Sequence, residues 1–359
     1  MATSSYKILV TGASGYIASH IIKQLQHLGY RVRGTVRSIE NKYKVSQICE
    51  LYPQAKYPLQ LVEADLLKAD TWHEAVHGCT HVIHTASPVP LEAVKNENDV
   101  IVPAVEGTLA VLRACQDAKT VKRVILTSST AAITGGIDTR NGDATFSEEN
   151  WTDPLKTRLP YVRSKTLAEK EAWKFISQLP KRSQFEMAVI NPSVVMGPLL
   201  CANQTATMEL LSRLMTNRLP LIPHINMTIV DVRDVAAAHV AAMTVPETAG
   251  HRHVVAPHNI WLKDIAEILR TEFQPLGYHI PRLEAPYFIV KVWSMFDERA
   301  RLVLMNWGVT SRYEMGRMHS VLGIEPYPIR DTLIDMAHSM IRFGFIEKTK
   351  EYLRMNVQQ

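Results

Sequence analysis

Residues 8–18 read Ile8-Leu9-Val10-Thr11-Gly12-Ala13-Ser14-Gly15-Tyr16-Ile17-Ala18, an apolar run followed by a glycine turn and the start of a helical pattern. Gly12 permits a sharp turn, and Gly15 removes a side chain where a pyrophosphate would approach backbone N–H groups. Ala18 lets the helix pack closely on the sheet, and the helix N-terminus favours phosphate charge. A plain turn is the alternative, but the position between a first strand and a first helix predicts a dinucleotide site. The expected contacts are Thr11, Gly12, Ser14, Gly15, Tyr16 and Ile17.

The first half of the chain alternates short apolar runs with helical patterns, which is typical of a parallel sheet with helices on both faces. Right-handed crossovers then predict a doubly wound α/β (Rossmann) fold, with ligands at the carboxyl ends of the strands. Strands are expected at Lys7–Thr11, Arg31–Val36, Leu59–Glu63, His81–Thr85, Arg123–Ser128 and Glu186–Asn191. Helices are expected near Tyr16–Leu28, Lys42–Leu51, Thr71–Val76, Asp99–Lys119 and Tyr161–Gln178.

The second half lacks the regular alternation of strand and helix patterns, because prolines interrupt the chain after Asn191. A further strand and helix are expected at Met227–Val230 and Arg233–Met243. With 359 residues the chain exceeds the usual size of one domain. We therefore expect a Rossmann domain made of residues 1–192 and 227–250, and a smaller mixed substrate-binding lobe made of residues 193–226 and 251–359.

Composition narrows the class of protein. The net charge of +5 comes from scattered basic residues with no run typical of nucleic-acid binding, so an anionic small molecule is the better partner. No apolar run approaches the roughly 20 residues of a membrane helix. The segment Met1–Lys7 is short and polar, unlike a secretory signal, and the four cysteines have no paired spacing. We expect a cytoplasmic monomer or homodimer that uses no membrane and no nucleic acid.

A metal site is not expected. The run His251-Arg252-His253, with His258 nearby, has no carboxylate or cysteine at ligand spacing, so these histidines fit a structural role better. Asp231 and Arg233 at a strand–helix junction fit helix capping and an internal ion pair. A set of apolar residues could wall a substrate pocket or fill a core: Met196, Leu199, Met208, Leu211 and Met215.

The end of the second strand indicates the cofactor. An enzyme that prefers NAD usually places Asp or Glu there, about 20 residues past the glycines, to hold the ribose hydroxyls. This chain has Arg37, followed by Lys42 and Lys44. A guanidinium can make bidentate, charge-assisted bonds to a 2′-phosphate, and a solvated arginine is the alternative. The sequence therefore predicts NADPH/NADP+ rather than NADH.

Small polar residues follow further strands at the same edge. Asp65 comes after the third strand, where it could meet the adenine ring or cap the following helix. Thr85, Ala86 and Ser87 follow the fourth strand, where they could lie near the pyrophosphate and ribose or form a simple turn. Thr127 near the end of the fifth strand is a further expected cofactor contact.

Residues 161–165 read Tyr161-Val162-Arg163-Ser164-Lys165, which puts a phenol and an amine on one face of an expected helix. Reducing a carbonyl requires a hydride on carbon and a proton on oxygen. A phenol with a pKa of about 10 is a poor acid–base group at neutral pH until a nearby cation favours its ionised form. Lys165 could supply that charge and also bind the nicotinamide ribose. The spacing Tyr-x-x-x-Lys also arises often by chance.

A hydroxyl near the end of the fifth strand strengthens this prediction. The run Thr127-Ser128-Ser129-Thr130 could place a hydroxyl beside the tyrosine and the substrate oxygen. We choose Ser129, because Ser128 extends the strand directly and can point the other way. A Ser/Thr turn is the local alternative. The order of glycine loop, serine and Tyr/Lys pair favours a catalytic group of Ser129, Tyr161 and Lys165.

From Lys7 to about Thr244 the chain resembles the extended short-chain dehydrogenases/reductases, and more closely their dihydroflavonol reductase-like branch. That branch includes yeast methylglyoxal (aldehyde) reductases and cinnamoyl-CoA reductases. Besides residues 11–18, the motifs are Gly34-Thr35-Val36-Arg37, His84-Thr85-Ala86-Ser87-Pro88, Ile101-Val102-Pro103-Ala104-Val105-Glu106-Gly107-Thr108, Leu126-Thr127-Ser128-Ser129, Tyr161-Val162-Arg163-Ser164-Lys165, Asn191-Pro192-Ser193-Val194-Val195-Met196-Gly197-Pro198 and Asp231-Val232-Arg233-Asp234-Val235-Ala236.

The resemblance implies roles for single residues. It implies that Arg37 and Lys44 hold the 2′-phosphate and that Asp65 and Leu66 contact the adenine. It also implies a catalytic triad of Ser129, Tyr161 and Lys165. The nicotinamide would be positioned by Pro192, Ser193 and Val194, and Pro192 suits this role because it fixes a rigid turn after the sixth strand.

Two departures limit the substrate. Plant flavonoid reductases carry an asparagine where this chain has Thr134, and the Asn-Trp-Tyr-Cys-Tyr-Gly-Lys signature of cinnamoyl-CoA reductases is absent around Tyr161. The expected activity is therefore the NADPH-dependent reduction of an aldehyde or ketone. Two alternatives stay open: an NAD-dependent nucleotide-sugar epimerase or dehydratase, and a non-catalytic NADPH-sensing protein. Arg37 speaks against the first, and the intact Tyr/Lys pair against the second.

Overall fold

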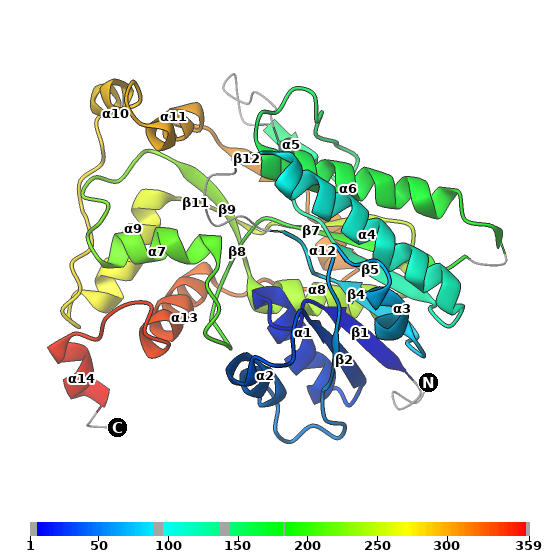
Figure 1. Cartoon of the computed structure of the whole chain (residues 1–359). Coiled ribbons are helices and arrows are strands. Elements are labelled where there is room, and N and C mark those ends of the chain that lie inside the picture. The colour runs from blue at the N-terminus through cyan, green and yellow to red at the C-terminus, as the bar shows by residue number, and fades with distance from the viewer. Residues whose placement is uncertain (1–5, 89–95, 136–143, 182–183, 357–359) are drawn as a thin grey trace.

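Parallel pairing of seven strands organises the computed structural model, which describes residues 6–88, 96–135, 144–181 and 184–356 (Figure 1). The strand order is β10-β7-β5-β4-β1-β2-β3, and every neighbouring pair is parallel. This order reverses direction at β1, which puts the carboxyl ends of β1 and β4 on either side of a switch point. The strands are β1 (Lys7–Thr11), β2 (Arg31–Val36), β3 (Gln60–Glu63), β4 (His81–His84), β5 (Arg123–Thr127), β7 (Glu186–Pro192) and β10 (Arg252–Val255).

Helices cover both faces of this sheet because its central strands are apolar on both sides. Along β1, Ile8 and Val10 pack into one core cluster, whereas Leu9 packs into the cluster on the opposite face. On the first face lie α1 (Tyr16–His27) and α8 (Val232–Thr244), with α2 (Lys42–Cys49) at the edge. On the second face lie α3 (Thr71–Val76), α4 (Asn98–Ala118) and α6 (Pro160–Ser177) (Figure 1).

The predicted Rossmann-type sheet is thus confirmed. The six strands and five helices expected in the first half, and the strand–helix pair β9–α8, all form within two residues of their predicted bounds. The expected capping and ion pair at the start of α8 are also confirmed. The Asp231 carboxylate accepts a hydrogen bond from the backbone N–H of Arg233 and lies 2.7 Å from its guanidinium.

A second, smaller set of elements packs beside the large sheet. Its three-stranded sheet has the order β11-β9-β8, and a two-stranded sheet pairs β12 with β6. Met196, Leu199, Met208, Leu211 and Met215 are all buried in its core, so packing explains these residues. The remaining strands and α-helices are α5 (Ala131–Thr134), β6 (Ala144–Phe146), β8 (Val194–Met196), α7 (Ala206–Met215), β9 (Asn226–Asp231), β11 (His258–Trp261), α9 (Leu262–Phe273), α10 (Tyr287–Trp293), α11 (Glu298–Met305), β12 (Ser311–Tyr313), α12 (Gly316–Ser320), α13 (Ile329–Arg342) and α14 (Lys350–Asn356). Of these, α12 packs on β10 of the large sheet and α5 packs on α6.

Strand pairing differs from the expected domain boundaries at two places, and the division into two domains stays a prediction. The sequence assigns residues 251–359 to the lobe, but β10 adds to the large sheet by pairing with β7. An arginine in a strand usually indicates an exposed segment, but the Arg252 side chain is buried and forms an ion pair with Glu169. The sequence also assigns residues 227–250 to the Rossmann domain, whereas β9 pairs with β8 and β11 in the small sheet.

Two general expectations concern the environment of the protein. None of the helices in the described part of the chain is long and apolar enough to cross a membrane. The four cysteines form no disulfide; Cys49 is exposed and Cys79, Cys115 and Cys201 are buried. Cytoplasmic location and oligomeric state stay predictions.

Candidate functional site

The glycine loop follows β1 and lies against the ends of β2 and β4. Gly12 has φ +67°, in the left-handed region, and its backbone N–H donates to Thr35 Oγ1 at 2.9 Å. A Cβ on Gly12 would lie 3.2 Å from the Cβ of Ala86, and a Cβ on Gly15 would lie 3.0 Å from the Gly12 carbonyl oxygen. Gly15 is also the N-cap of α1 and has no side chain to satisfy the first N–H groups of the helix. The backbone around the start of α1 therefore fits a phosphate cradle.

Gly34 on β2 is what allows this loop to lie so close to the sheet. A Cβ on Gly34 would lie 2.6 Å from the Cβ of Ala13, which is closer than two carbons can approach. We expect Gly34→Ala to lower the free energy of unfolding by about 1–3 kcal/mol, because the buried loop must shift. Urea denaturation would measure this change. Gly316→Ala is the control, since nothing lies within 4 Å of a Cβ there; equal losses in both variants would contradict the steric explanation.

Thr11 fixes the junction between the first and fourth strands. Its Oγ1 accepts hydrogen bonds from the backbone N–H groups of Thr85 and Ala86, at 3.1 and 3.0 Å. The Thr11 hydroxyl proton is therefore left for His84 Nδ1, 2.8 Å away, which places the proton of the neutral imidazole on Nε2. Burial lowers the pKa of His84 to about 3, so the ring is neutral. Thr85, Ala86 and Ser87 thus border the glycine loop, as a dinucleotide site requires.

Arg37 and Lys44 are exposed beyond the carboxyl end of β2. Thr35, two residues before Arg37, holds the glycine loop through its side chain and its carbonyl oxygen. The backbone N–H of Lys44 donates to the side chain of Asn41, which caps α2. Arg37 therefore follows a segment that adjoins the loop, where a 2′-phosphate could be reached from solvent, and contact of Lys44 with that phosphate stays a prediction.

Asp65 shapes the turn after β3. Its carboxylate accepts a hydrogen bond from the backbone N–H of Leu67 at 2.9 Å. The alternative that Asp65 caps the next helix is wrong, because the N-cap of α3 is Asp70. Leu66 lies against α4, where a Cβ on Gly107 would come within 2.7 Å of the Leu66 side chain. Contact of Asp65 and Leu66 with an adenine stays a prediction.

The candidate catalytic residues come together where β5 ends and α6 begins. Pro160 opens α6, so Tyr161 and Lys165 lie on its first two turns. The Ser129 hydroxyl accepts the backbone N–H of Ala131 at 3.1 Å, donates to the Pro192 carbonyl oxygen at 3.5 Å, and lies near enough to Tyr161 to lower the pKa of that phenol. Burial raises the pKa of Tyr161, and Ser129 opposes that rise only in part. Tyr161 is therefore protonated near neutral pH and suited to donate a proton.

Lys165 is buried beneath the same strand end. Its Nζ donates to the Thr127 carbonyl oxygen at 3.3 Å, which ties α6 to β5. Burial lowers the pKa of Lys165 to about 8, and the charge of Glu169 works in the opposite direction. The Lys165 ammonium is thus mostly charged at neutral pH and loses its proton at slightly alkaline pH.

The two neighbouring serines lie just past the end of β5 and have different partners on α6. Ser129 faces Tyr161, whereas the Ser128 hydroxyl donates to Glu169 at 2.5 Å. This geometry agrees with the choice of Ser129 from the sequence, and its catalytic role stays a proposal.

The turn between β7 and β8 carries the three residues expected at the nicotinamide. The Pro192 carbonyl oxygen accepts the backbone N–H of Thr130, and the backbone N–H of Ser193 donates to Val255. The Ser193 hydroxyl is buried and has no hydrogen-bond partner among the described residues. A buried hydroxyl without a partner is suited to hydrogen-bond a bound ligand, here the carboxamide of the expected nicotinamide.

Sequence reasoning missed two contributors. Asn203 follows the turn after β8 and donates a side-chain hydrogen bond to the Ser14 carbonyl oxygen in the glycine loop. No sequence pattern marks this residue, because the contact depends on how the small sheet packs. Glu169 was also overlooked, although it lies one helical turn beyond Lys165 on the face that carries Tyr161.

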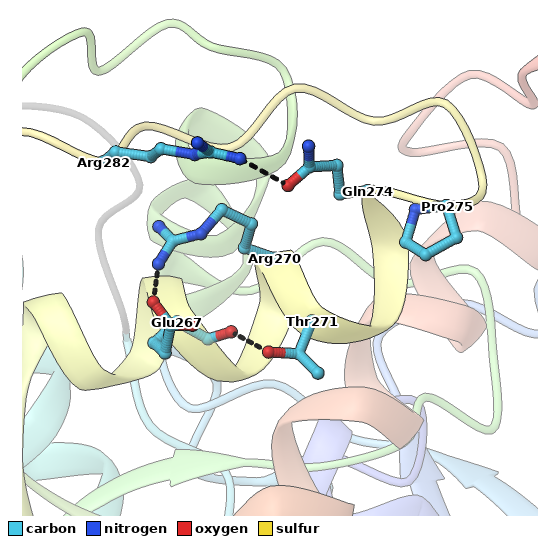
Figure 2. A pocket seen from close by; sticks show the side chains of 6 residues that line it. All are labelled: Glu267, Arg270, Thr271, Gln274, Pro275 and Arg282. Atoms are coloured by element: carbon cyan, nitrogen blue, oxygen red, sulfur yellow. Dashed lines mark hydrogen bonds and ion pairs between the residues drawn. The ribbon is translucent and has the colours of Figure 1, made fainter.

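A surface depression on α9 contains none of the predicted site residues (Figure 2). Arg270 pairs with Glu267, and Arg282 donates to the side chain of Gln274. The polar groups of this depression are thus largely satisfied within the protein, and nothing in it suggests chemistry.

The geometry can now be compared with known proteins. Residues 8–256 match the model of the NAD dependent epimerase/dehydratase family. The chain belongs to this family. It is 36% identical over 300 residues to cinnamoyl-CoA reductase CAD2 of Medicago truncatula, covering 82% of this chain and 89% of that protein. It is 32% identical over 288 residues to dihydroflavonol 4-reductase of Zea mays, covering 78% of each chain.

A solved member of similar architecture is the yeast methylglyoxal/isovaleraldehyde reductase Gre2, crystallised with NADPH. The TM-score is 0.78 at 28% identity, over 94% of this chain and 99% of that one. The resemblance noted from the motifs is therefore confirmed at the level of the family and of its reductase members.

Proposed function

We propose that this protein is an NADPH-dependent reductase that converts an aldehyde or ketone to the alcohol. The observation that carries the proposal is that Tyr161 and buried Lys165, one helical turn apart on α6, come together with Ser129 at the end of β5. Further support comes from family members named as reductases of cinnamoyl-CoA, dihydroflavonol, methylglyoxal and isovaleraldehyde, and from a crystal structure of one of them with NADPH.

Each catalytic residue has one task in this proposal. Bound NADPH supplies a hydride to the carbonyl carbon. Tyr161 donates its phenolic proton to the carbonyl oxygen, so that the alcohol leaves as a neutral product. Ser129 holds that oxygen beside Tyr161 with a hydrogen bond, and the Lys165 ammonium stabilises the phenolate that remains.

The cofactor-binding residues surround the carboxyl edge of the large sheet. The loop would hold the pyrophosphate, Arg37 and Lys44 the 2′-phosphate, and Lys165 the nicotinamide ribose. The buried Ser193 hydroxyl would meet the carboxamide. The full proposed set is Thr11, Gly12, Ser14, Gly15, Tyr16, Ile17, Arg37, Lys44, Asp65, Leu66, Thr85, Ala86, Ser87, Thr127, Tyr161, Lys165, Pro192, Ser193 and Val194.

The test is cofactor oxidation by the purified protein, followed by absorbance with NADPH and NADH in parallel. The substrates would be methylglyoxal, aliphatic and aromatic aldehydes, diketones and one flavanonol. Turnover with NADPH supports the proposal and ranks the substrates. A protein that purifies with NAD bound and reduces none of them would instead favour the nucleotide-sugar class. Tight NADPH binding without turnover, unchanged by Tyr161→Phe, would favour a sensor.

A further inference from the structure

A buried carboxylate lies directly behind the candidate catalytic lysine. Glu169 is only 1% exposed and belongs to α6, one turn after Lys165. Its Oε2 accepts the Ser128 hydroxyl at 2.5 Å and the Asn191 amide at 2.9 Å. Its Oε1 accepts Arg252 Nε at 2.6 Å.

These partners are the neighbours of the proposed site. Ser128 directly precedes Ser129 at the end of β5. Asn191 directly precedes Pro192 in β7, and its amide also donates to the Ser129 carbonyl oxygen at 3.2 Å. One carboxylate thus connects the helix that carries Tyr161 to the two strand ends that carry the catalytic serine and the nicotinamide turn.

The Arg252 guanidinium offsets part of the free-energy cost of burying the Glu169 carboxylate. Arg252 is 7% exposed, stacks over the Trp151 ring at 3.8 Å and donates to the carbonyl oxygens of Glu148 and Asn150. A buried ion pair is weak evidence for stability, because removing both charges from water offsets their attraction. Its location suggests that the pair serves the geometry of the site instead.

We propose that Glu169 is a positioning residue for carbonyl reduction, which fixes Ser129 and the Pro192 turn relative to Tyr161 and Lys165. This inference rests on the proposed function. The hydrogen bonds of Glu169 go to Ser128, Asn191 and Arg252 and not to Ser129 Oγ or Tyr161, so it acts through its neighbours.

The charge environment of Lys165 gives the proposal a signature in pH. Glu169 and His84 line the same small cavity as Lys165, together with Ser128 and Thr127. His84, at the end of β4, is neutral because burial lowers its pKa to about 3. Arg252, from β10, forms an ion pair with Glu169 and is held on the far side of that carboxylate by the carbonyl oxygens of Glu148 and Asn150. Glu169 is therefore the charged partner that raises the pKa of Lys165 against burial.

The first test is Glu169→Gln, which keeps the size of the side chain and removes its charge. We expect kcat to fall about 10- to 100-fold, because small displacements of catalytic groups are costly, while KM for NADPH stays close to the wild-type value. Loss of the negative charge also lowers the pKa of Lys165, so the alkaline fall in kcat begins at a lower pH than in the wild type. Glu171→Gln is the matched control on the same helix, because Glu171 pairs with Lys174 near the surface and with no other cation among the described residues; it should leave both quantities unchanged.

Removing Glu169 alone leaves the Arg252 charge buried, and the single variant can fail to fold. The double variant Glu169→Gln with Arg252→Gln removes both charges and should fold, yet it should still lose kcat and shift the alkaline fall to lower pH, by less than Glu169→Gln because the opposing Arg252 charge is removed too. A wild-type pH profile in either folded variant would overturn the proposal.

A readout independent of turnover separates this proposal from the proposed function. Lysine-selective NMR can follow the titration of Lys165, assigned with Lys165→Met. If the wild type reduces no carbonyl, the proposed function fails. A lower Lys165 pKa in the double variant would then still support the effect of Glu169 on the lysine, and an unchanged pKa would refute it.

Discussion

Tyr161→Phe is expected to lower kcat for carbonyl reduction by about 10²–10⁴-fold, the usual contribution of general acid catalysis. The variant keeps the ring and loses the only proton that Tyr161 can give to the carbonyl oxygen. Because burial raises the pKa of Tyr161, the hydroxyl is protonated in the resting protein and is a ready donor. NADPH should still bind, since the loop and the Arg37 region are untouched.

The measurement is kcat from initial rates of NADPH oxidation, with the NADPH dissociation constant taken from a separate fluorescence titration. Tyr52→Phe is the control. It also removes one phenolic hydroxyl, which lies 3.0 Å from His27 on the outer edge of the fold. A Tyr161→Phe protein that keeps most of its kcat would show that another group supplies the proton, and the assignment of Ser129 would lose its reason.

The central fold could be predicted from the sequence because most of its strands have a short apolar centre of Val, Ile or Leu. Each such apolar segment, as in β4 or β5, must be covered on both faces, and the helical patterns between them provide the cover. The catalytic serine and the Tyr/Lys pair were readable for a related reason. Strand ends and helix starts are local features, and the sheet topology then brings them to one edge.

The features that were missed depend on contacts between distant segments. Arg252 and Glu169 are 83 residues apart, and a charged residue taken alone reads as surface. The ion pair is what allows the Arg252 and Glu169 side chains to be buried together. Neither the addition of β10 to the large sheet nor the role of Glu169 could therefore be derived from composition or hydrophobic periodicity. The hydrogen bond from Asn203 to Ser14 likewise joins residues 189 positions apart, so no local sequence pattern predicts it. We expect substrate recognition to depend on such contacts in the small sheet and its helices, so the sequence specifies the cofactor better than the substrate.

Arg37→Ala is expected to change the choice of cofactor more than any other single substitution. Hydrogen bonds to charged groups contribute about 1.5–3 kcal/mol, so losing the guanidinium should raise the dissociation constant of NADPH about 10- to 100-fold. NADH has no 2′-phosphate, and its affinity should stay nearly constant. The position of Arg37 supports this expectation, because it is exposed just beyond β2 and close to the segment that holds the glycine loop.

Fluorescence titrations with both cofactors at several salt concentrations would measure the effect. A contact between opposite charges weakens as salt increases, so the NADPH affinity of the wild type should depend on salt more steeply than that of Arg37→Ala. Arg31→Ala is the control, because Arg31 lies at the opposite end of the same strand and stacks over Tyr57. If Arg37→Ala weakened NADPH and NADH equally, Arg37 would support the shape of the loop rather than recognise the phosphate, and the selectivity would have to come from Lys44 or from the glycine loop itself.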